Sequence, residues 1–249
     1  MYKKIGFLFF VLVVLILGCS KSKPDAKVDE MLTTSMNTVD QIVQDELDRL
    51  HTIAELKDVQ EGNWDFIKAA LTENETDRNA ALYWYSLPSG SYFTSEKDKV
   101  EANLSSRGYF PDLLAGKDVV GYPIVGKTSG RKSFVIAVPV IVEEEVYGIL
   151  GTSIYLDEMW DFLNDKLIIP EKYDFYAVNT MGITMFDLET KDHLLANTLE
   201  QTSTTLVEAI KVIISTENGT VTYKWNDKKK TAVYRTSPVT NWRYVISYY

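Results

Sequence analysis

The stretch Tyr83-Trp84-Tyr85-Ser86-Leu87-Pro88-Ser89-Gly90-Ser91-Tyr92 predicts a strand, a tight turn and a returning strand. Aromatic residues favour strands, and Pro-Ser-Gly is typical of a turn. Successive side chains on a strand point to opposite faces, so Tyr83 and Tyr85 share one face and Trp84 takes the other. We therefore expect a hairpin of residues 81–86 and 91–94 to open a sheet.

The segment after this hairpin changes character twice. Residues 95–118 are polar and contain predicted helical fragments at 100–104 and 110–115. Apolar alternation then predicts three strands in succession. We expect these strands at 119–127, 133–142 and 146–156. Asp157 is expected to cap a short helix over residues 158–167.

A second, smaller unit repeats this plan. Strands are expected at 173–179 and 183–186, and a helix with apolar positions from Leu206 to Ile214 follows. The last three strands are expected at 220–225, 231–237 and 241–248. The sequence thus predicts an α+β fold with an internal repeat of hairpin, helical insert and three-strand meander. Such units leave a cleft between the sheet and its insert.

A long amphipathic helix is expected before the first hairpin. From Val28 to Val59 the apolar residues recur in steps of three and four, which places them on one stripe of a helix. Residues 64–71 predict a second helical piece after a break at Gly62. The stripe must pack against something, either the body of its own domain or a second copy of the chain.

The N-terminus has the features of an export signal. Lys3 and Lys4 precede an uncharged apolar run of about 14 residues, shorter than the roughly 20 that span a bilayer. The residues Ile16-Leu17-Gly18-Cys19 resemble the lipobox of bacterial lipoproteins. This resemblance implies a signal peptide over residues 1–18, acylation of Cys19 and a lipid-anchored tether over residues 19–27. The alternative is an uncleaved signal anchor with a free thiol.

Composition excludes several classes of protein. Cys19 is the only cysteine, so the folded part has no disulfide and no thiolate metal site. The chain of 249 residues has a net charge of −9 and no large basic cluster, which argues against nucleic acid as a partner. The run Lys228-Lys229-Lys230 follows Asn226-Asp227 and predicts a solvated hairpin tip.

Catalysis and metal binding are not indicated either. His51 and His193 are the only histidines, and neither has the spacing of a metal site or a catalytic triad. Asp187, Glu189 and Asp192 lack the oxygen spacing of an EF-hand loop. No glycine-rich phosphate loop is present. We therefore expect a protein without enzymatic activity, cofactor or metal.

The order of motifs resembles a known family of sensor domains. After the first hairpin come Arg107-Gly108-Tyr109-Phe110, Lys127-Thr128-Ser129-Gly130, Ile136-Ala137-Val138-Pro139-Val140 and Gly148-Ile149-Leu150-Gly151. This order is similar to the double Cache (PAS-like) extracellular sensor domain of chemoreceptors and sensor kinases, over about residues 30–249. The resemblance implies helical pieces over 28–75, a membrane-distal lobe over 76–168 and a membrane-proximal lobe over 169–249.

The resemblance also implies a small ligand between the distal sheet and its insert. Amino-acid-binding members hold the carboxylate with an Arg-x-Trp-Tyr-like motif, which is altered here to Arg107-Gly108-Tyr109-Phe110, and hold the amine with a later Asp, whose expected position carries Ser153. A buried ammonium without a charged partner is costly, so a carboxylate or another small anion facing Arg107 fits better. The predicted ligand contacts are Arg107, Tyr109, Phe110, Tyr83, Tyr85, Tyr122 and Ser153.

Each of these contacts has an alternative. Arg107 is otherwise a surface arginine or a structural bridge to Asp112 or Asp118, and the tyrosines are otherwise ordinary sheet aromatics. Ser153 is otherwise a small packing residue. Should the ligand carry an amine, Asp112 or Asp118 would be the candidates to neutralise it.

These features predict an extracytoplasmic, lipid-anchored sensor-type protein. No transmembrane helix or signalling module follows the last strand, so we expect a separate transmembrane receptor or kinase as partner, or a homodimer formed through the helix over 28–59. One alternative is a solute-capture lipoprotein that serves a transporter. The other is a structural interaction domain that has lost its ligand.

Overall fold

The computed structural model describes residues 25–73, 81–127 and 129–249. The predicted signal peptide, Cys19 and most of the tether lie outside these residues. Among the described residues, no helix is long and apolar enough to cross a membrane.

The longest element is the helix α1 (Ala26–Ala54), whose first turn is capped by the side chain of Asp25. Its apolar stripe is buried against the body of the same chain, as in the first of the two packing arrangements expected from the sequence. The prediction of one helix as far as Val59 was wrong: Leu56 has extended backbone angles and interrupts it. Two short helices follow, α2 (Lys57–Gln60) and α3 (Trp64–Thr72).

The first sheet has six strands, and all neighbouring strands pair antiparallel in the order β3-β2-β1-β6-β5-β4. Its strands are β1 (Ala81–Ser86), β2 (Ser91–Thr94), β3 (Lys99–Asn103), β4 (Val119–Val125), β5 (Lys132–Val142) and β6 (Glu145–Tyr155). The predicted hairpin and meander are confirmed. The predicted helical fragment at 100–104 is wrong, because β3 continues the sheet beyond β2. The fragment at 110–115 is present as α4 (Phe110–Leu114).

The second sheet has five strands in the order β8-β7-β11-β10-β9, also antiparallel throughout. Its strands are β7 (Tyr173–Val178), β8 (Thr184–Asp187), β9 (Asn218–Trp225), β10 (Lys228–Thr236) and β11 (Arg243–Tyr248). The insert contains two short 3-10 helices, η2 (Lys191–His193) and η3 (Thr198–Glu200), and the helix α6 (Thr204–Ser215). The strand order matches β2-β1-β6-β5-β4 of the first sheet, so the predicted repeat is confirmed as a repeat of topology.

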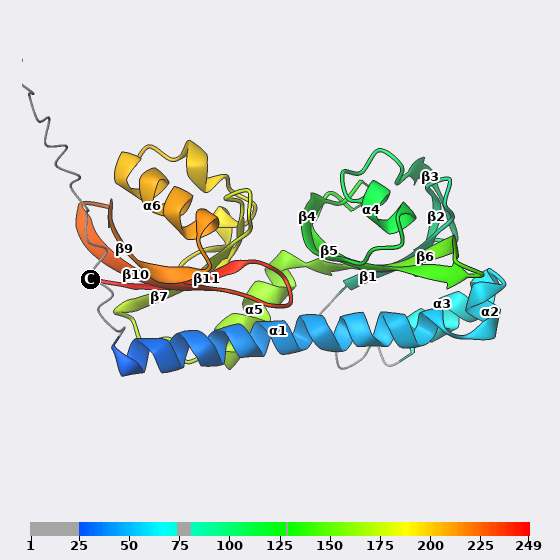
Figure 1. Ribbon diagram of the computed structural model, residues 1–249, viewed down its shortest axis with the longest axis horizontal. Helices are drawn as coiled ribbons and strands as arrows, with labels where there is room; N and C mark the ends of the chain where they lie inside the picture. The colour runs from blue at the N-terminus through cyan, green and yellow to red at the C-terminus, as the bar shows by residue number, and fades with distance from the viewer. Residues whose placement is uncertain (1–24, 74–80, 128) are drawn as a thin grey trace, which may run out of the picture.

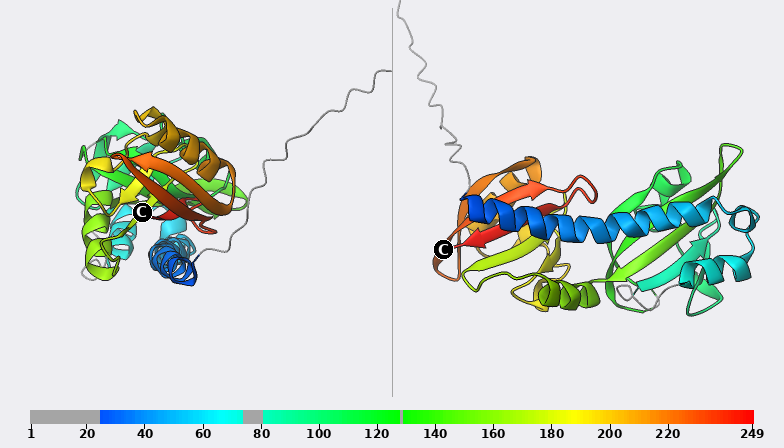
Figure 2. Two further views of the ribbon diagram at one scale, coloured as in Figure 1. Left: turned by 90° about the vertical axis from the view of Figure 1, so that its left-hand side faces the viewer. Right: turned by 90° about the horizontal axis from the view of Figure 1, so that it is seen from below.

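The two sheets lie end to end, with α1 along one face of both and each insert on the opposite face (Figure 1). Figure 2 shows the same arrangement from the end and from below. We call the six-stranded sheet with its insert the distal lobe, and the five-stranded sheet with its insert the proximal lobe. The exact residue boundaries of the predicted lobes, 76–168 and 169–249, stay a prediction.

Polar contacts fix α1 to the proximal lobe. Arg235 of β10 donates to Asp29 at 2.6 Å and to Thr33 at 2.7 Å. The buried carboxylate of Asp40 accepts hydrogen bonds from Ser237 at 2.8 Å and from Tyr244 at 3.0 Å. The register of the helix on the sheet is therefore specified by directional contacts as well as by its apolar stripe.

Two further predictions are corrected by the structure. The helix α5 (Leu156–Lys166) begins before the expected cap, so Asp157 lies within its first turn and ion-pairs with Arg131 at 2.7 Å. In the lysine run, Lys228 and Lys229 are exposed, but Lys230 is 6% exposed and ion-pairs with Asp174 at 2.6 Å. The turn itself is Asn226-Asp227, both with positive φ.

Candidate ligand-binding site

The distal lobe contains a cavity between the sheet and its insert, where the sequence predicts a ligand. Its volume is about 30 Å³, enough for about two water molecules. The lining residues come from β1, β2, β4, β5 and β6, from the turn between β4 and β5, and from the insert. They are Leu82, Trp84, Tyr92, Leu104, Arg107, Tyr109, Ile124, Gly126, Lys127, Ser129, Ser133, Ser153 and Tyr155.

The charged side chains among these lining residues are both cationic. The guanidinium of Arg107 donates from Nη2 to the carbonyl oxygen of Val125 at 3.0 Å. The ammonium of Lys127 donates to the carbonyl oxygen of Asn103 at 2.8 Å and to the Ser106 hydroxyl at 2.9 Å. The lining set includes no carboxylate. The cavity therefore combines two positive charges with an otherwise aromatic and hydroxyl-bearing wall.

Two polar atoms at this cavity have no hydrogen-bond partner among the described residues. They are Nε of Arg107 and Oγ of Ser133, and both atoms are buried. Leaving a donor unpaired away from water costs about 1–3 kcal/mol, and more when the donor is charged. An acceptor that occupied the cavity would satisfy the guanidinium donor, which is the recognition chemistry expected for an anion.

The structure brings together three of the predicted contacts, Arg107, Tyr109 and Ser153. The Ser153 hydroxyl accepts a buried hydrogen bond from Nε1 of Trp84 at 3.2 Å. Tyr109 is 2% exposed, and burial raises the pKa of its phenol, which keeps it a neutral donor. Of the alternatives for Arg107, neither bridge forms: Asp118 contacts His51 at 2.9 Å and Asp112 contacts Lys117 at 3.7 Å.

The other four predicted contacts do not line this cavity. Tyr83 and Tyr85 do share a face, but it is the face packed in the core beneath α1. Phe110 is 1% exposed and packs in the apolar core of the distal insert. Tyr122 packs edge-on against Tyr109, with ring centroids 5.3 Å apart. These four residues therefore lie around the cavity and outside its lining, and their role as ligand contacts stays a prediction.

Sequence reasoning missed Trp84, Tyr92, Lys127, Ser133 and Tyr155 as lining residues. Alternation along the first hairpin already separates Trp84 from Tyr83 and Tyr85. It does not say which face carries the insert. That information depends on where α1 packs, which no local pattern in the hairpin records.

Metal binding has no support in the described part of the chain, where no group of three or more His, Cys, Asp or Glu residues is placed to hold an ion. Asp187 instead contacts Nδ1 of His193 at 2.6 Å and accepts the backbone N–H of Glu189 at 3.0 Å. The acidic segment around Asp187 is thus occupied by local hydrogen bonds.

Solved structures share this fold at low sequence identity. The ligand-binding domain of the Pseudomonas aeruginosa amino acid chemoreceptor PctB, in complex with L-Arg, has a TM-score of 0.70 and 12% identity, over 89% of this chain and 93% of that one. The extracellular domain of the putative histidine kinase mmHK1S-Z2 has a TM-score of 0.67 and 17% identity, over 89% and 95%.

A third similar structure is the sensory domain of the Campylobacter jejuni chemoreceptor Tlp3 with isoleucine bound. Its TM-score is 0.64 at 13% identity, over 89% of this chain and 90% of that one. No curated protein matches the sequence. The family model of the Cache domain matches residues 21–248, nearly the whole chain. The chain therefore belongs to the Cache domain family.

Proposed function

We propose that the chain is a lipid-anchored, extracytoplasmic sensor-type protein that binds a small anion, in particular a carboxylate, in the distal cavity. The observation that carries this proposal is the charge of the lining residues. Arg107 and Lys127 are both cationic, no lining residue is acidic, and Nε of Arg107 is buried without a partner among the described residues. This arrangement supports the binding of an anion.

The bound ligands of two similar structures are amino acids, L-Arg in PctB and isoleucine in Tlp3. An amino acid would bring its ammonium group into the distal cavity along with its carboxylate. Ser153 stands where the family's pattern leads us to expect an acidic residue, and a buried ammonium without an anionic partner is strongly unfavourable. A carboxylate that lacks an amine therefore fits this lining better than an amino acid does.

The size of the cavity narrows the ligand further. A volume of about 30 Å³ admits only a few non-hydrogen atoms without movement of the walls. Formate and acetate are of this size, and each presents the two oxygens that a guanidinium binds in a two-pronged way. We expect such short carboxylates to bind in preference to longer ones.

Thermal stability of the full chain in detergent tests the distal site. Formate and acetate should raise the melting temperature, and ethylamine should not. A ligand at a hundred times its dissociation constant stabilises by about 2.7 kcal/mol, which is readily measured. Arg107→Met should abolish the response to acetate. The matched control is Lys117→Met, because Lys117 is exposed and lies outside the cavity lining. No response to any anion, or an unchanged response of Arg107→Met, would contradict the proposal.

The anchor requires its own experiment. A lipoprotein signal predicts that a radiolabelled or clickable fatty acid is incorporated into the wild-type chain and not into Cys19→Ala. Incorporation of the fatty acid into Cys19→Ala, or its absence from the wild-type chain, would contradict acylation at this residue.

We propose that the chain acts through a separate transmembrane partner. The fold is shared with domains of chemoreceptors and of a putative histidine kinase, which supports a partner of that class. Crosslinking of the full chain in its native membrane, followed by identification of the crosslinked species, should recover a transmembrane receptor or kinase in a ratio that changes with ligand. Recovery of monomers alone, with and without acetate, would contradict a sensing role.

A further inference from the structure

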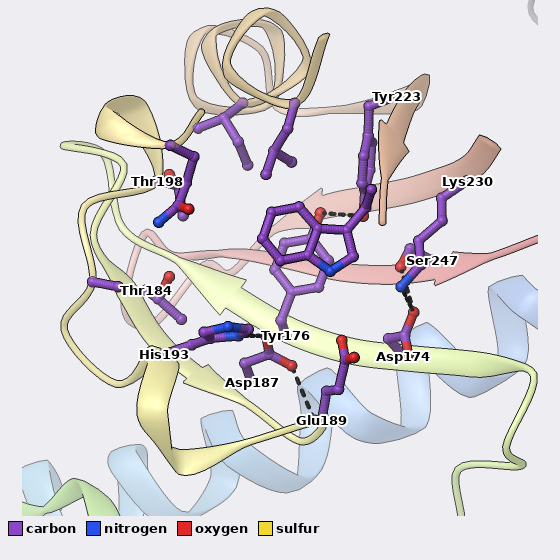
Figure 3. Close-up of a pocket in the computed structure, with 15 residues that line it drawn as sticks. Asp174, Tyr176, Thr184, Asp187, Glu189, His193, Thr198, Tyr223, Lys230 and Ser247 are labelled. Atoms are coloured by element: carbon purple, nitrogen blue, oxygen red, sulfur yellow. Dashed lines mark hydrogen bonds and ion pairs between the residues drawn. The ribbon is translucent and has the colours of Figure 1, made fainter. Parts of the chain in front are cut away.

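The proximal lobe contains a second cavity with the opposite charge. Its volume is about 70 Å³, about twice that of the distal one, and it lies between the five-stranded sheet and α6. Figure 3 shows Asp187 and His193 on one side of this cavity, Asp174, Lys230 and Ser247 on the other, and Glu189 between the two groups. The apolar part of its lining is Tyr176, Ala196, Leu206, Ile210, Tyr223 and Trp225.

The register of the strands places this cavity at the same point of the repeat as the distal one. In the distal sheet, Ser153 pairs with Leu82, and in the proximal sheet Ser247 pairs with Asp174. By the same correspondence, Tyr176 occupies the position equivalent to Trp84, and Lys230 the position equivalent to Ser133. The two cavities therefore occupy equivalent places in the two lobes. Where the distal cavity has the apolar Leu82, the proximal cavity has the acidic Asp174.

Three carboxylates line the proximal cavity, and only one of them is fully neutralised by a neighbour. Asp174 contacts Lys230 at 2.6 Å and accepts a hydrogen bond from Ser247 at 3.0 Å. Asp187 contacts Nδ1 of His193 at 2.6 Å, a pairing that carries a compensating charge only when the imidazole is protonated. Glu189 is exposed at the rim, with no hydrogen bond to its side chain among the described residues. The cavity is thus negative overall at neutral pH.

The aromatic wall beside these carboxylates suits a cation. The indole of Trp225 lies next to His193, with ring centroids 6.1 Å apart, and the hydroxyls of Tyr176 and Tyr223 are 3.4 Å from one another at the back of the cavity. A cation that contacts Asp187 from within the cavity would lie against aromatic faces, which attract positive charge. The remaining apolar lining would cover a short hydrocarbon group.

We propose that the proximal cavity binds a small organic cation, a primary ammonium on a short apolar group, through Asp187 and Glu189 with Trp225 as its aromatic wall. The ammonium replaces His193 as the partner of Asp187. This site is independent of the anion proposed for the distal lobe, because the two cavities share no lining residue.

Three ligands of similar size and different charge test the proposal. The full chain in detergent is titrated with n-butylamine, n-butanol and butyrate at about pH 8, where an alkyl ammonium with a pKa of roughly 10 remains charged. The amine alone should raise the melting temperature. An equal response to butanol would show unspecific apolar binding and would overturn the proposal, as would the absence of any response to the amine.

Substitutions in the lining of the proximal cavity test whether the amine binds there. Asp187→Asn keeps the oxygen that accepts the Glu189 N–H but removes the charge, and should weaken amine binding by at least about tenfold. Trp225→Leu should weaken it several-fold. Asp192→Asn is the matched control, since Asp192 is an exposed carboxylate that does not line the cavity.

Two further variants separate this site from its alternatives. His193→Gln leaves Asp187 charged and should retain amine binding, which shows that a loss in Asp187→Asn is not caused by a disturbed loop. Arg107→Met should also retain it, because Arg107 belongs to the distal cavity. Wild-type binding by Asp187→Asn, or loss of amine binding in Arg107→Met, would overturn the assignment to the proximal cavity.

Discussion

Nε1 of Trp242 donates a hydrogen bond to the carbonyl oxygen of Gly121 at 3.1 Å, and this buried contact joins the two lobes. Trp242 belongs to the turn between β10 and β11 of the proximal lobe, whereas Gly121 lies in β4 of the distal lobe. The indole also packs edge-on against Phe134 of β5, with ring centroids 5.1 Å apart. One side chain thus provides both an apolar and a directional link between the sheets.

We expect Trp242→Ala to lower the free energy of unfolding by about 3–5 kcal/mol, because a large buried ring is removed from a packed interface. Trp242→Phe should cost less, since it keeps an aromatic ring beside Phe134 and loses only the hydrogen bond to Gly121. Denaturant unfolding of the full chain in detergent measures both values. A loss below about 1 kcal/mol for Trp242→Ala would show that the link contributes little.

Gly121 should not tolerate a side chain. Its φ is +75°, and an added Cβ would lie 2.8 Å from Nε1 of Trp242. Gly130 is the matched control, because its φ is +66° but nothing lies within 4 Å of an added Cβ. Gly130→Ala should cost about 1–2 kcal/mol for the left-handed backbone. Gly121→Ala should cost about 1–3 kcal/mol more for the clash, and equal melting temperatures of the two variants would contradict this.

The charged carboxylate of Asp40 should lower the free energy of unfolding at neutral pH, compared with a neutral side chain of the same shape. Burial raises its pKa above the ordinary 3.8, against the lowering effect of the Ser237 and Tyr244 hydrogen bonds. A carboxyl whose pKa is raised on folding favours the folded state at low pH, and this advantage is lost as the pH rises through the folded pKa. Asp40→Asn keeps an acceptor oxygen for Tyr244 and should be at least as stable as wild type at neutral pH.

The control for this variant is Asp40→Ala, which removes the carboxylate acceptor from Ser237 and Tyr244. It should lose about 1–3 kcal/mol. Unfolding free energies measured from about pH 4 to 7 should fall for wild type relative to Asp40→Asn. A constant difference over this range would show that the Asp40 pKa is unchanged by folding.

The pair of His193 and Asp187 should give a pH dependence of the same sign as that of Asp40, but at higher pH. The hydrogen bond to Asp187 raises the pKa of His193 above its ordinary 6.5, assisted by the nearby charges of Glu189 and Asp192 and opposed by partial burial. A histidine whose pKa is raised on folding stabilises the fold below the unfolded value. That stabilisation is lost as the pH rises through the folded pKa.

His193→Gln should therefore be less stable than wild type below about pH 6.5, with the difference shrinking as the pH increases above it. Unfolding at several pH values between about 5.5 and 8.5 measures this difference. Asp192→Asn provides the control for a general change of local charge, and should alter the pH profile much less. A difference that grows with pH would contradict protonation of His193 as its source.

Much of the fold could be predicted from the sequence, since hairpin turns such as Pro88-Ser89-Gly90 and alternating apolar strands carry local signals. β3 could not, because only Val100 of its residues is buried and its apolar spacing does not distinguish an edge strand from a helical turn. The end of α1 at Ala54 was also missed. No glycine or proline marks it, and the extended backbone of Leu56 serves the turn into α2.

The distal site could be predicted only in part for a related reason. Arg107 and Ser153 were predicted from the resemblance to the sensor family. Ser133 reaches the cavity through strand pairing, and Lys127 reaches it from the turn after β4, and the sequence displays neither arrangement. The sequence predicts a cleft in the second unit, but it gives no signal for the ion pair that lines this cavity. Asp174 and Lys230 are far apart along the chain and meet only because β10, β11 and β7 are neighbours in the sheet.

The length of α1 determines the distance between the distal cavity and a membrane to which the N-terminus is attached. The start of α1 and the C-terminus both lie at the proximal end of the molecule (Figure 1), and 29 residues at about 1.5 Å each make α1 about 44 Å long. The proposed lipid attachment before Ala26 would therefore hold the proximal lobe near the lipid headgroups and the distal lobe beyond them. The distal cavity would then sample bulk solvent, while the negative proximal cavity would sample the layer of counterions next to the bilayer.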